Sequence, residues 1–327
     1  MLTIIEDKVE NCRAQRRMEK MFRDMTGRSE KLNIGWQGGN TWTKISWSND
    51  LGLWWSFLDD RDGTVRYWRA FGIEEPRWGT NTSHAIKCEI NSPFKNFSRR
   101  IGGAFASDNA GNAFLIHRGN IGGGKKGVGK NLFLDYSNAE KCIVRDPHGE
   151  VEVALVGTLE SKRFCKQVSE FVHDIAKIRS LGNSEPKDAV LKSYDPEYIG
   201  QKKYRVVNTI VSNCDHGLLV DAMRKLLEKQ DKKVSKDRYC DLYLLNTRGV
   251  PQTIFEFKTD DSLSSVYSAI GQLLFRSVQW PSAKLVSVFP DTISNSVTAK
   301  LRQLEIHCVT YRWDKNYPRF RSIQNLV

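Results

Sequence analysis

The sequence predicts two domains: a mainly β (α+β) domain over residues 1–180 and an α/β domain over residues 206–327. The first prediction rests on short aromatic strands broken by turn residues, and the second on a regular alternation of helix and strand patterns. With 327 residues, the chain is also longer than one hydrophobic core usually organises. Residues 181–205 hold Gly, Pro, Ser and mixed charge without periodicity, so we expect them to form the linker.

The N-terminal domain is expected to begin with a helix and continue as strands. Residues 1–30 are charged with spaced apolar residues, and residues 33–80 then read as short strands. Turns are predicted at Asp62-Gly63, at residues 109–111 and at residues 147–149, and an apolar stripe over residues 161–180 predicts a closing helix. Seven of the nine tryptophans lie in the strand region: Trp36, Trp42, Trp47, Trp54, Trp55, Trp68 and Trp78.

These tryptophans have two interpretations. Most of them suit the core of a small β domain, because buried aromatic residues belong to a core far more often than to a ligand platform. One or two could instead line a pocket for a flipped or modified base, since indole stacks well on bases. Successive residues of a strand point to opposite faces, so tandem Trp54-Trp55 would leave at least one ring outside the core.

The formal net charge of +12 is concentrated in one part of the chain. Between residues 95 and 130 the basic residues greatly outnumber the acids, of which Asp108 is the one present. Clustered positive charge favours a surface that faces phosphates over charge that only aids solubility. The residues predicted to contact DNA are Arg99, Arg100, Arg118, Lys125, Lys126 and Lys130, with His117 beside them.

The segment from Gly124 to Lys130 has the spacing of a phosphate-binding P-loop. Asn131 stands where Ser or Thr would bind Mg²⁺, and the extended pattern LFLDYS follows where a helix should start, so an ATP-driven enzyme is disfavoured. Two interpretations stay open: a loop that touches DNA phosphates through lysines and backbone N–H groups, or an ordinary exposed hairpin loop.

The chain is expected to be cytoplasmic and reduced. No run of 18 apolar residues occurs, and the N-terminus lacks the apolar region of a secretory signal. The seven cysteines show no CxxC spacing and no disulfide framework.

The C-terminal domain is predicted to contain helices and strands in alternation. A helix opens at Asp215, a plausible N-cap, and the strands CDLYLLN and TIFEFK follow as a hairpin. Asp261 or Ser262 can cap the next helix. The strand KLVSVFP, a helix near residues 294–304 and the strand HCVTYRW complete the order.

Three ionisable residues of the hairpin are predicted to converge. Glu256 and Lys258 alternate with phenylalanines in TIFEFK, so both point to one face of the strand, and the hairpin places Asp241 beside them. A buried group of charges needs pairing or a metal. Two carboxylates can hold Mg²⁺, which polarises a phosphate and lowers the pKa of an attacking water, while a lysine stabilises the negative transition state.

Asp241, fourteen intervening residues and Glu256-Phe257-Lys258 resemble the PD-(D/E)XK nuclease superfamily, the restriction-endonuclease-like fold. The resemblance covers about 110 residues and says nothing of the N-terminal domain. It implies Asp241 and Glu256 as ligands of Mg²⁺, for which Mn²⁺ can substitute, with the carbonyl of Phe257 as a further ligand. It also implies that Lys258 is catalytic and that Gln272, on the next helix, supports the site. Asp221 or His216 could join the site from the first helix, and the sequence leaves both open.

The resulting expectation is a Mg²⁺-dependent DNA endonuclease with a separate recognition domain. Its expected partners are double-stranded DNA and a second copy of the chain, assembled in solution or only on DNA. Restriction or anti-phage defence is the setting that analogy with the superfamily suggests. The alternative is a non-catalytic nucleic-acid-binding protein on the same scaffold.

Overall fold

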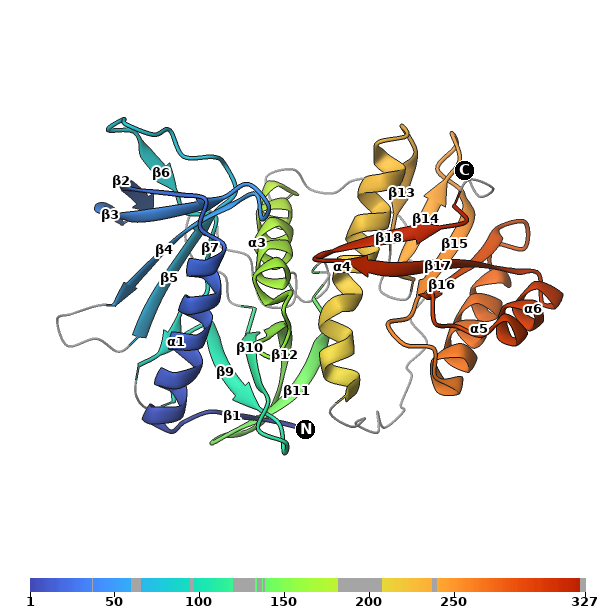
Figure 1. The fold of residues 1–327 in the computed structure, drawn as a ribbon, viewed down its shortest axis with the longest axis horizontal. Coiled ribbons are helices and arrows are strands. Elements are labelled where there is room, and N and C mark those ends of the chain that lie inside the picture. The colour runs from blue at the N-terminus through green and yellow to red at the C-terminus, as the bar shows by residue number, and fades with distance from the viewer. Residues whose placement is uncertain are drawn as a thin grey trace. The chain divides into compact units, whose positions relative to one another are not determined.

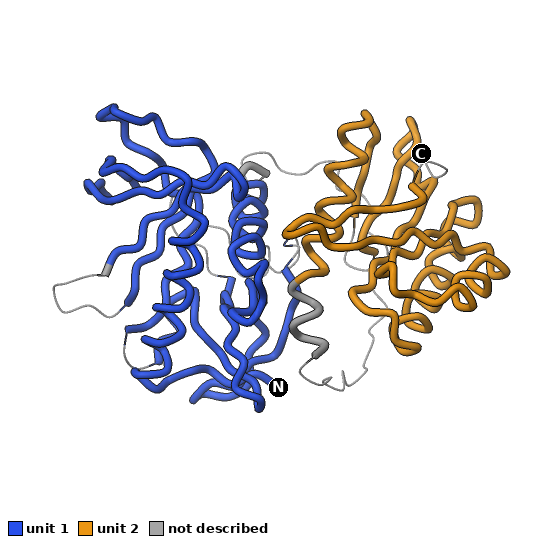
Figure 2. The backbone as a smooth tube through the Cα atoms, in the orientation of Figure 1, with its two compact units in different colours: residues 1–214 blue, residues 215–327 orange. Residues whose placement is uncertain are grey.

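The protein is a mixed α/β structure made mainly of strands. The computed structural model describes residues 1–36, 38–59, 66–94, 97–119, 133, 137, 139–181, 208–236 and 240–323, and they form five helices and three sheets. The chain divides into two compact units, residues Met1–Cys214 and Asp215–Val327 (Figure 2). The expected linker, residues 181–205, lies outside the described residues except for its first position.

Unit 1 contains a closed barrel of five strands in the order β1-β11-β12-β10-β9 (Figure 1). These strands are β1 (Leu2–Ile4), β9 (Gly103–Ser107), β10 (Ala113–His117), β11 (Lys141–Asp146) and β12 (Gly149–Thr158). The short β1 closes the barrel because it pairs in parallel with β11 and antiparallel with β9. Aliphatic and phenylalanine side chains such as Ile4, Phe114 and Val153 fill a core of their own. The sequence prediction missed β1, because its three residues precede a strong helix pattern.

A second sheet of unit 1 has the order β6-β2-β3-β4-β5-β7, with β8 also paired to β5. Its strands are β2 (Arg28–Trp36), β3 (Gly39–Ser48), β4 (Leu53–Asp59), β5 (Arg66–Gly72), β6 (Ser83–Ala85), β7 (Cys88–Glu89) and β8 (Ser92–Pro93). Trp54 and Trp55 point to opposite faces, and both are buried, in two different hydrophobic clusters. The expectation that one of them lies outside the core was wrong, because this sheet is covered on both faces.

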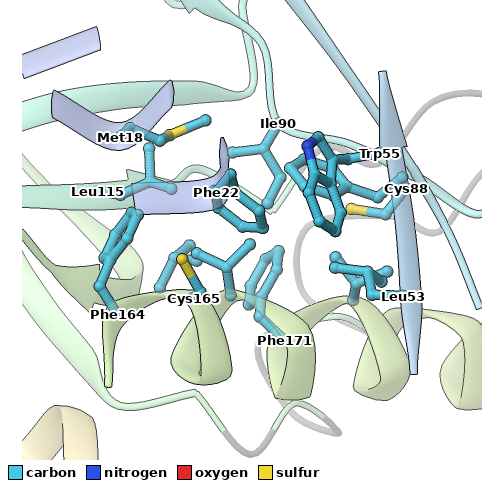
Figure 3. Packing of buried hydrophobic residues seen from close by; sticks show 14 of the residues in the cluster. Met18, Phe22, Leu53, Trp55, Cys88, Ile90, Leu115, Phe164, Cys165 and Phe171 are labelled. Atoms are coloured by element: carbon cyan, nitrogen blue, oxygen red, sulfur yellow. The ribbon is translucent and has the colours of Figure 1, made fainter. Parts of the chain in front are cut away.

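Two helices cover the Trp55 face of this sheet: α1 (Lys8–Asp24) and α3 (Phe164–Leu181). Asp7 caps α1 by accepting hydrogen bonds from the N–H groups of residues 9 and 10. Figure 3 shows Phe22 from α1 between Trp55 and Phe164, and its ring contacts both. The Phe22 and Trp55 ring centroids are 5.1 Å apart in an edge-to-face arrangement. Each such fully buried side chain contributes roughly 1.5–3 kcal/mol.

The predicted helices and turns of unit 1 are largely confirmed. Gly111 has positive φ in the turn between β9 and β10, and Gly149 has positive φ where β12 begins after the turn from β11. Strands β4 and β5 form the expected hairpin, and its Asp62-Gly63 turn lies outside the described residues. The extended segment expected over LFLDYS is wrong at Phe133, which has helical backbone.

Unit 2 is built on one mixed sheet in the order β13-β14-β15-β16-β17-β18. Strands β15, β16 and β17 are parallel to one another, and the other neighbouring pairs are antiparallel. The strands are β13 (Lys233–Ser235), β14 (Leu242–Leu245), β15 (Pro251–Phe257), β16 (Lys284–Pro290), β17 (Ile306–Asp314) and β18 (Tyr317–Arg321). Strands β13 and β18 were not predicted.

Helices cover both faces of this sheet (Figure 1). Helix α4 (Asn208–Glu228) packs on the face that carries Phe255 and Phe257. Helices α5 (Leu263–Ser277) and α6 (Asn295–Gln303) pack on the face that carries Tyr243 and Ile254. Because successive residues of a strand alternate between faces, the two cores are built from interleaved residues of the same strands.

The helix ends of unit 2 correct one sequence prediction and resolve another. Helix α4 already includes Asn208, so Asp215 lies inside the helix and is not its N-cap. Ser262, not Asp261, caps α5, because its side chain accepts a hydrogen bond from the N–H of Ser265. None of the helices in the described ranges is long and apolar enough to cross a membrane.

One buried histidine of unit 1 makes the stability of the protein sensitive to pH. His117, at the end of β10, is 1% exposed, and its Nδ1 accepts the N–H of Gly119 at 3.0 Å. Burial, together with the nearby charge of Arg118, lowers the pKa of His117 from 6.5 to about 4. The folded state therefore keeps this ring neutral at pH values where the unfolded state protonates it.

We predict that wild type loses stability relative to His117→Gln as the pH falls from 6.5 to about 4. The change reaches at most about 3 kcal/mol, because one pKa unit corresponds to about 1.4 kcal/mol. Urea unfolding at a series of pH values measures it, with His307→Gln, at an exposed position of β17, as the control. A difference between wild type and His117→Gln that does not vary with pH would refute the assignment.

Candidate functional site

The hairpin of β14 and β15 brings Asp241 next to Glu256. The strands pair antiparallel, with Leu242 opposite Phe255 and Tyr243 opposite Ile254. One further step in this register places Asp241 opposite Glu256. Asp241 directly precedes β14 instead of lying inside it, and its Oδ2 accepts the N–H of Phe257 at 2.9 Å. The backbone of β15 therefore holds the carboxylate that directly precedes β14.

Lys258 connects Glu256 with helix α5. Its Nζ donates to Glu256 Oε1 at 2.5 Å and to Gln272 Oε1 at 2.8 Å. Ser268, one turn earlier on α5, donates its hydroxyl to the same Gln272 oxygen at 3.2 Å. The lysine ammonium is thus held by one acceptor on the sheet, Glu256, and one on the helix, Gln272.

Lys258 is also held through its backbone. Its N–H donates to Val288 O at 2.9 Å, and its carbonyl accepts the hydroxyl of Tyr311 at 3.3 Å. The sequence prediction named neither Tyr311 nor Ser268. Ser268 could have been found from its spacing of four residues from Gln272 on one helix, whereas Tyr311 is 53 residues from Lys258 and carries no local signal.

Helix α4 contributes His216. Its Nε2 lies 3.2 Å from Asp241 Oδ1, and its ring meets Phe257 edge-on with centroids 6.4 Å apart. Asp221, the other residue that the sequence left open, forms ion pairs with Arg224 and Lys225 of its own helix. The geometry therefore favours His216 over Asp221 as the α4 residue of the site.

The two carboxylates have opposite electrostatic environments. Burial and the neighbouring charge of Asp241 raise the pKa of Glu256 to about 7, although Lys258 opposes the shift. Burial would raise the pKa of Asp241 too, but His216, the N–H of Phe257 and Lys258 outweigh it and hold that pKa below its ordinary value. Asp241 is therefore ionised, and Glu256 beside it resists ionisation. A cation placed between them would remove that resistance.

The donor set is compatible with Mg²⁺. The described residues contain no group of three or more His, Cys, Asp or Glu side chains arranged to hold a metal. Mg²⁺ does not need one, because it keeps several waters and is commonly bound through one or two carboxylates. Asp241 and Glu256 would be those carboxylates, and the backbone carbonyl of Phe257 as a further ligand stays a prediction.

Burial argues against an ordinary surface ion-pair network. The side chains of Glu256 and Lys258 are 6% and 16% exposed. A buried ion pair contributes little net stability, because desolvation offsets the attraction between its charges. The cluster is therefore not explained by stability alone, and a functional role is the better account of it.

The predicted DNA-binding residues are placed differently from one another. Arg99 and Arg100 are both exposed, and Arg99 also forms a two-point ion pair with Asp146, with nitrogen–oxygen distances of 2.7 and 2.9 Å. Arg118 is only 4% exposed and donates to Ile101 O at 3.0 Å. This burial corrects the expectation that Arg118 and His117 line an open surface. Lys125, Lys126 and Lys130 lie outside the described residues, together with the Gly-rich segment.

The tryptophans of unit 1 lie mainly in the core. Trp47, Trp54 and Trp55 are buried, whereas Trp36 and Trp42 are 36% and 46% exposed. Trp36 packs edge-on against Trp68, with ring centroids 5.0 Å apart. The core interpretation therefore accounts for the three buried rings, and Trp36 and Trp42 are the two with the accessibility that stacking on a base needs.

Comparisons with protein-family models, with curated proteins and with solved structures find no match to this chain.

The environment of Glu256 predicts how the metal-free protein responds to pH. A carboxyl with a folded pKa of about 7 and an ordinary pKa of 4.5 costs stability as the pH rises through that interval. In EDTA, Glu256→Gln should therefore gain stability relative to wild type between pH 4.5 and 7, by up to about 3 kcal/mol. Urea unfolding of both proteins measures the gain.

Asp291→Asn, at an exposed position after β16, is the matched control and should show no such gain. Added Mg²⁺ should narrow the gap between wild type and Glu256→Gln at pH 8, since only wild type keeps both carboxylates. A gap that is the same at every pH would show that the Glu256 carboxyl does not carry this cost.

Proposed function

We propose that unit 2 is a Mg²⁺-dependent endodeoxyribonuclease of the PD-(D/E)XK type. The observation that carries the proposal is the hydrogen-bonded series Glu256–Lys258–Gln272 with Asp241 beside Glu256. These residues come from a hairpin and the helix after it, and helices cover both faces of the sheet. Both the residues and this order of elements are what the resemblance to that superfamily implies.

Each side chain of the site has a role in this proposal. Asp241 and Glu256 would hold Mg²⁺, which when bound polarises the scissile phosphate and lowers the pKa of a coordinated water. Lys258 orients the attacking water and stabilises the negative charge that develops on the phosphate. Gln272 holds the Lys258 ammonium in place, and His216 keeps Asp241 oriented.

Unit 1 is proposed to recognise double-stranded DNA. The support is the basic character of residues 95–130, the exposure of Arg100 and the accessible Trp36 and Trp42 rings. A function in restriction or anti-phage defence, with modified bases as one target, rests on analogy with enzymes that separate recognition from cleavage.

A non-catalytic nucleic-acid-binding protein is the second candidate. One observation favours it: the charged groups are already paired within the protein, Lys258 with Glu256 and Asp241 with His216 and the N–H of Phe257. A hydrogen-bonded network of this kind can persist as a structural element. Cleavage by wild type separates the two candidates.

We predict that wild type cleaves DNA in Mg²⁺ and that Asp241→Asn, Glu256→Gln and Lys258→Met each lower the rate by roughly 10²–10³-fold or more. Gel assays on unmodified and base-modified duplexes measure the rate. Asp291→Asn and Lys300→Met change exposed residues of the same unit and serve as matched controls that should retain activity. Equal cleavage by the site variants would place the active site elsewhere, and no cleavage of any duplex would support the binding protein.

Substitutions of the neighbouring Arg99 and Arg100 should have different effects, because we expect Arg99 to stabilise the fold and Arg100 to contact DNA. Arg99→Met leaves the buried Asp146 carboxylate without its guanidinium, so it should lower the urea midpoint clearly. Arg100→Met should leave stability unchanged but weaken DNA binding and reduce its salt dependence by about one unit of slope. Binding assays at several salt concentrations test this. An unchanged slope in Arg100→Met would remove that residue from the DNA-facing set.

A further inference from the structure

The outer face of α5 carries an apolar stripe that nothing in the described structure covers. Five large apolar side chains on or directly after this helix are between 41% and 79% exposed: Leu263, Tyr267, Leu274, Phe275 and Val278. With about 100° of rotation per residue they fall within an arc of about 120°. The opposite side of α5 packs on the sheet through Val266, Ala269 and Leu273. The helix is thus apolar on two sides, whereas a surface helix normally has a polar outer face.

This stripe has no charged residue of its own. The other exposed positions of α5 are Ser264, Ser268, Gly271 and Gln272. A charged group lies at its edge, where the Arg276 guanidinium is 5.8 Å from the Phe275 ring centre. The chain has 27% charged residues and a net charge of +12, so a helix face without charges is unusual for its surface.

Gly271 stands at the middle of the stripe, and the chain itself gives no reason for a glycine there. A Cβ built at this position would meet no atom within 4 Å. Glycine in a helix interior is less favourable than alanine, so an exposed one needs a cause outside the helix. Close approach of another helix backbone is such a cause, because only glycine leaves room for it.

Two aromatic residues lie at equal distances on either side of Gly271. Tyr267 lies four residues before it and Phe275 four residues after it. Two copies of α5 that cross antiparallel at Gly271 would set Tyr267 of each against Phe275 of the partner subunit. A two-fold axis requires this kind of self-complementary patch.

We infer that the outer face of α5 is a self-association surface, which pairs antiparallel with α5 of a second copy of this chain and crosses it at Gly271. Charge supports this occupant over others. A nucleic acid needs cations along its path, and the stripe has none to offer. Two copies of a strongly basic chain repel each other over most of their surface, and an uncharged face is where that repulsion is weakest.

The size of the stripe limits the strength of the pair. Partly exposed aromatic and aliphatic side chains of this kind bury roughly 100 Å² each, so one stripe contributes on the order of 500 Å² and the pair about 1,000 Å². Stable interfaces begin at about 1,200 Å². The dimer should therefore be weak and dependent on concentration, and a shared ligand that holds both copies would strengthen it.

The test is the mass of the full-length protein in solution, measured by sedimentation over a wide range of concentrations. Wild type should move from the mass of one chain toward that of two as concentration rises. Tyr267→Glu and Phe275→Glu should remain at one chain throughout. Leu304→Glu changes an exposed apolar residue (44%) outside the stripe, and it should behave as wild type.

Gly271→Ala separates a defect in association from a defect in folding. Since its Cβ meets no atom of its own chain, alanine should raise the thermal midpoint of the monomer while weakening the dimer at least tenfold. Cysteine pairs test the antiparallel arrangement: Gly271→Cys should crosslink with itself, and Ser264→Cys should crosslink with Val278→Cys but not with itself.

Three results would overturn the inference. One is a wild type that stays a single chain at every concentration. Another is a dimer that survives both glutamate variants. The third is a monomer that Phe275→Glu destabilises, which would show that another part of the same chain covers the stripe. None of these readouts depends on cleavage, so the outcome is independent of the nuclease proposal.

Discussion

Strand β15 is buried on both faces, and its alternation sets the structure of unit 2. Phe255 and Phe257 enter the core beneath α4, so the residues between and after them must face the other way. That geometry places the Glu256 carboxylate and the Lys258 ammonium together below α5. Shifting the strand by one residue would turn both phenylalanines away from the core beneath α4 and bury Lys258 in that apolar core, so packing and charge select the same register.

The free-energy cost of this arrangement falls on Glu256. Its carboxyl is almost fully buried next to an ionised Asp241, and one lysine offsets only part of the penalty. The surrounding packing holds the groups together against that penalty: Tyr311 and Val288 fix the backbone of Lys258, and α5 supplies Gln272. An electrostatic cost of this kind is tolerated where function requires it.

Helix α5 serves three surfaces at once. Its buried side completes the core on one face of the sheet, and Gln272 reaches Lys258. Its outer side carries the uncharged stripe centred on Gly271. Gln272 directly follows Gly271 in the chain, so a second copy bound at the stripe would contact the helix turn that positions Lys258. In unit 1, by contrast, the covered sheet explains why most of its tryptophans are structural residues.

Local sequence patterns predicted the main helices, the hairpin of β14 and β15, and the side of β15 on which Glu256 and Lys258 lie. They could do so because the periods of 2 and 3.6 residues reflect backbone geometry within a few residues. The same reasoning failed for the short strands β1, β13 and β18, since a strand of three to five residues is recognised by its partners more than by its own composition.

The sequence by itself named Asp241, Glu256 and Lys258, by residue type and by their places on two adjacent strands, and the resemblance to the nuclease superfamily added Gln272. Only the tertiary structure decided that His216, not Asp221, contacts Asp241, and that Arg118 and His117 are buried. It alone showed that α5 is apolar on its outer side as well as its inner side. The physical reason is that burial and pairing depend on what other segments cover, and a single segment does not contain that information.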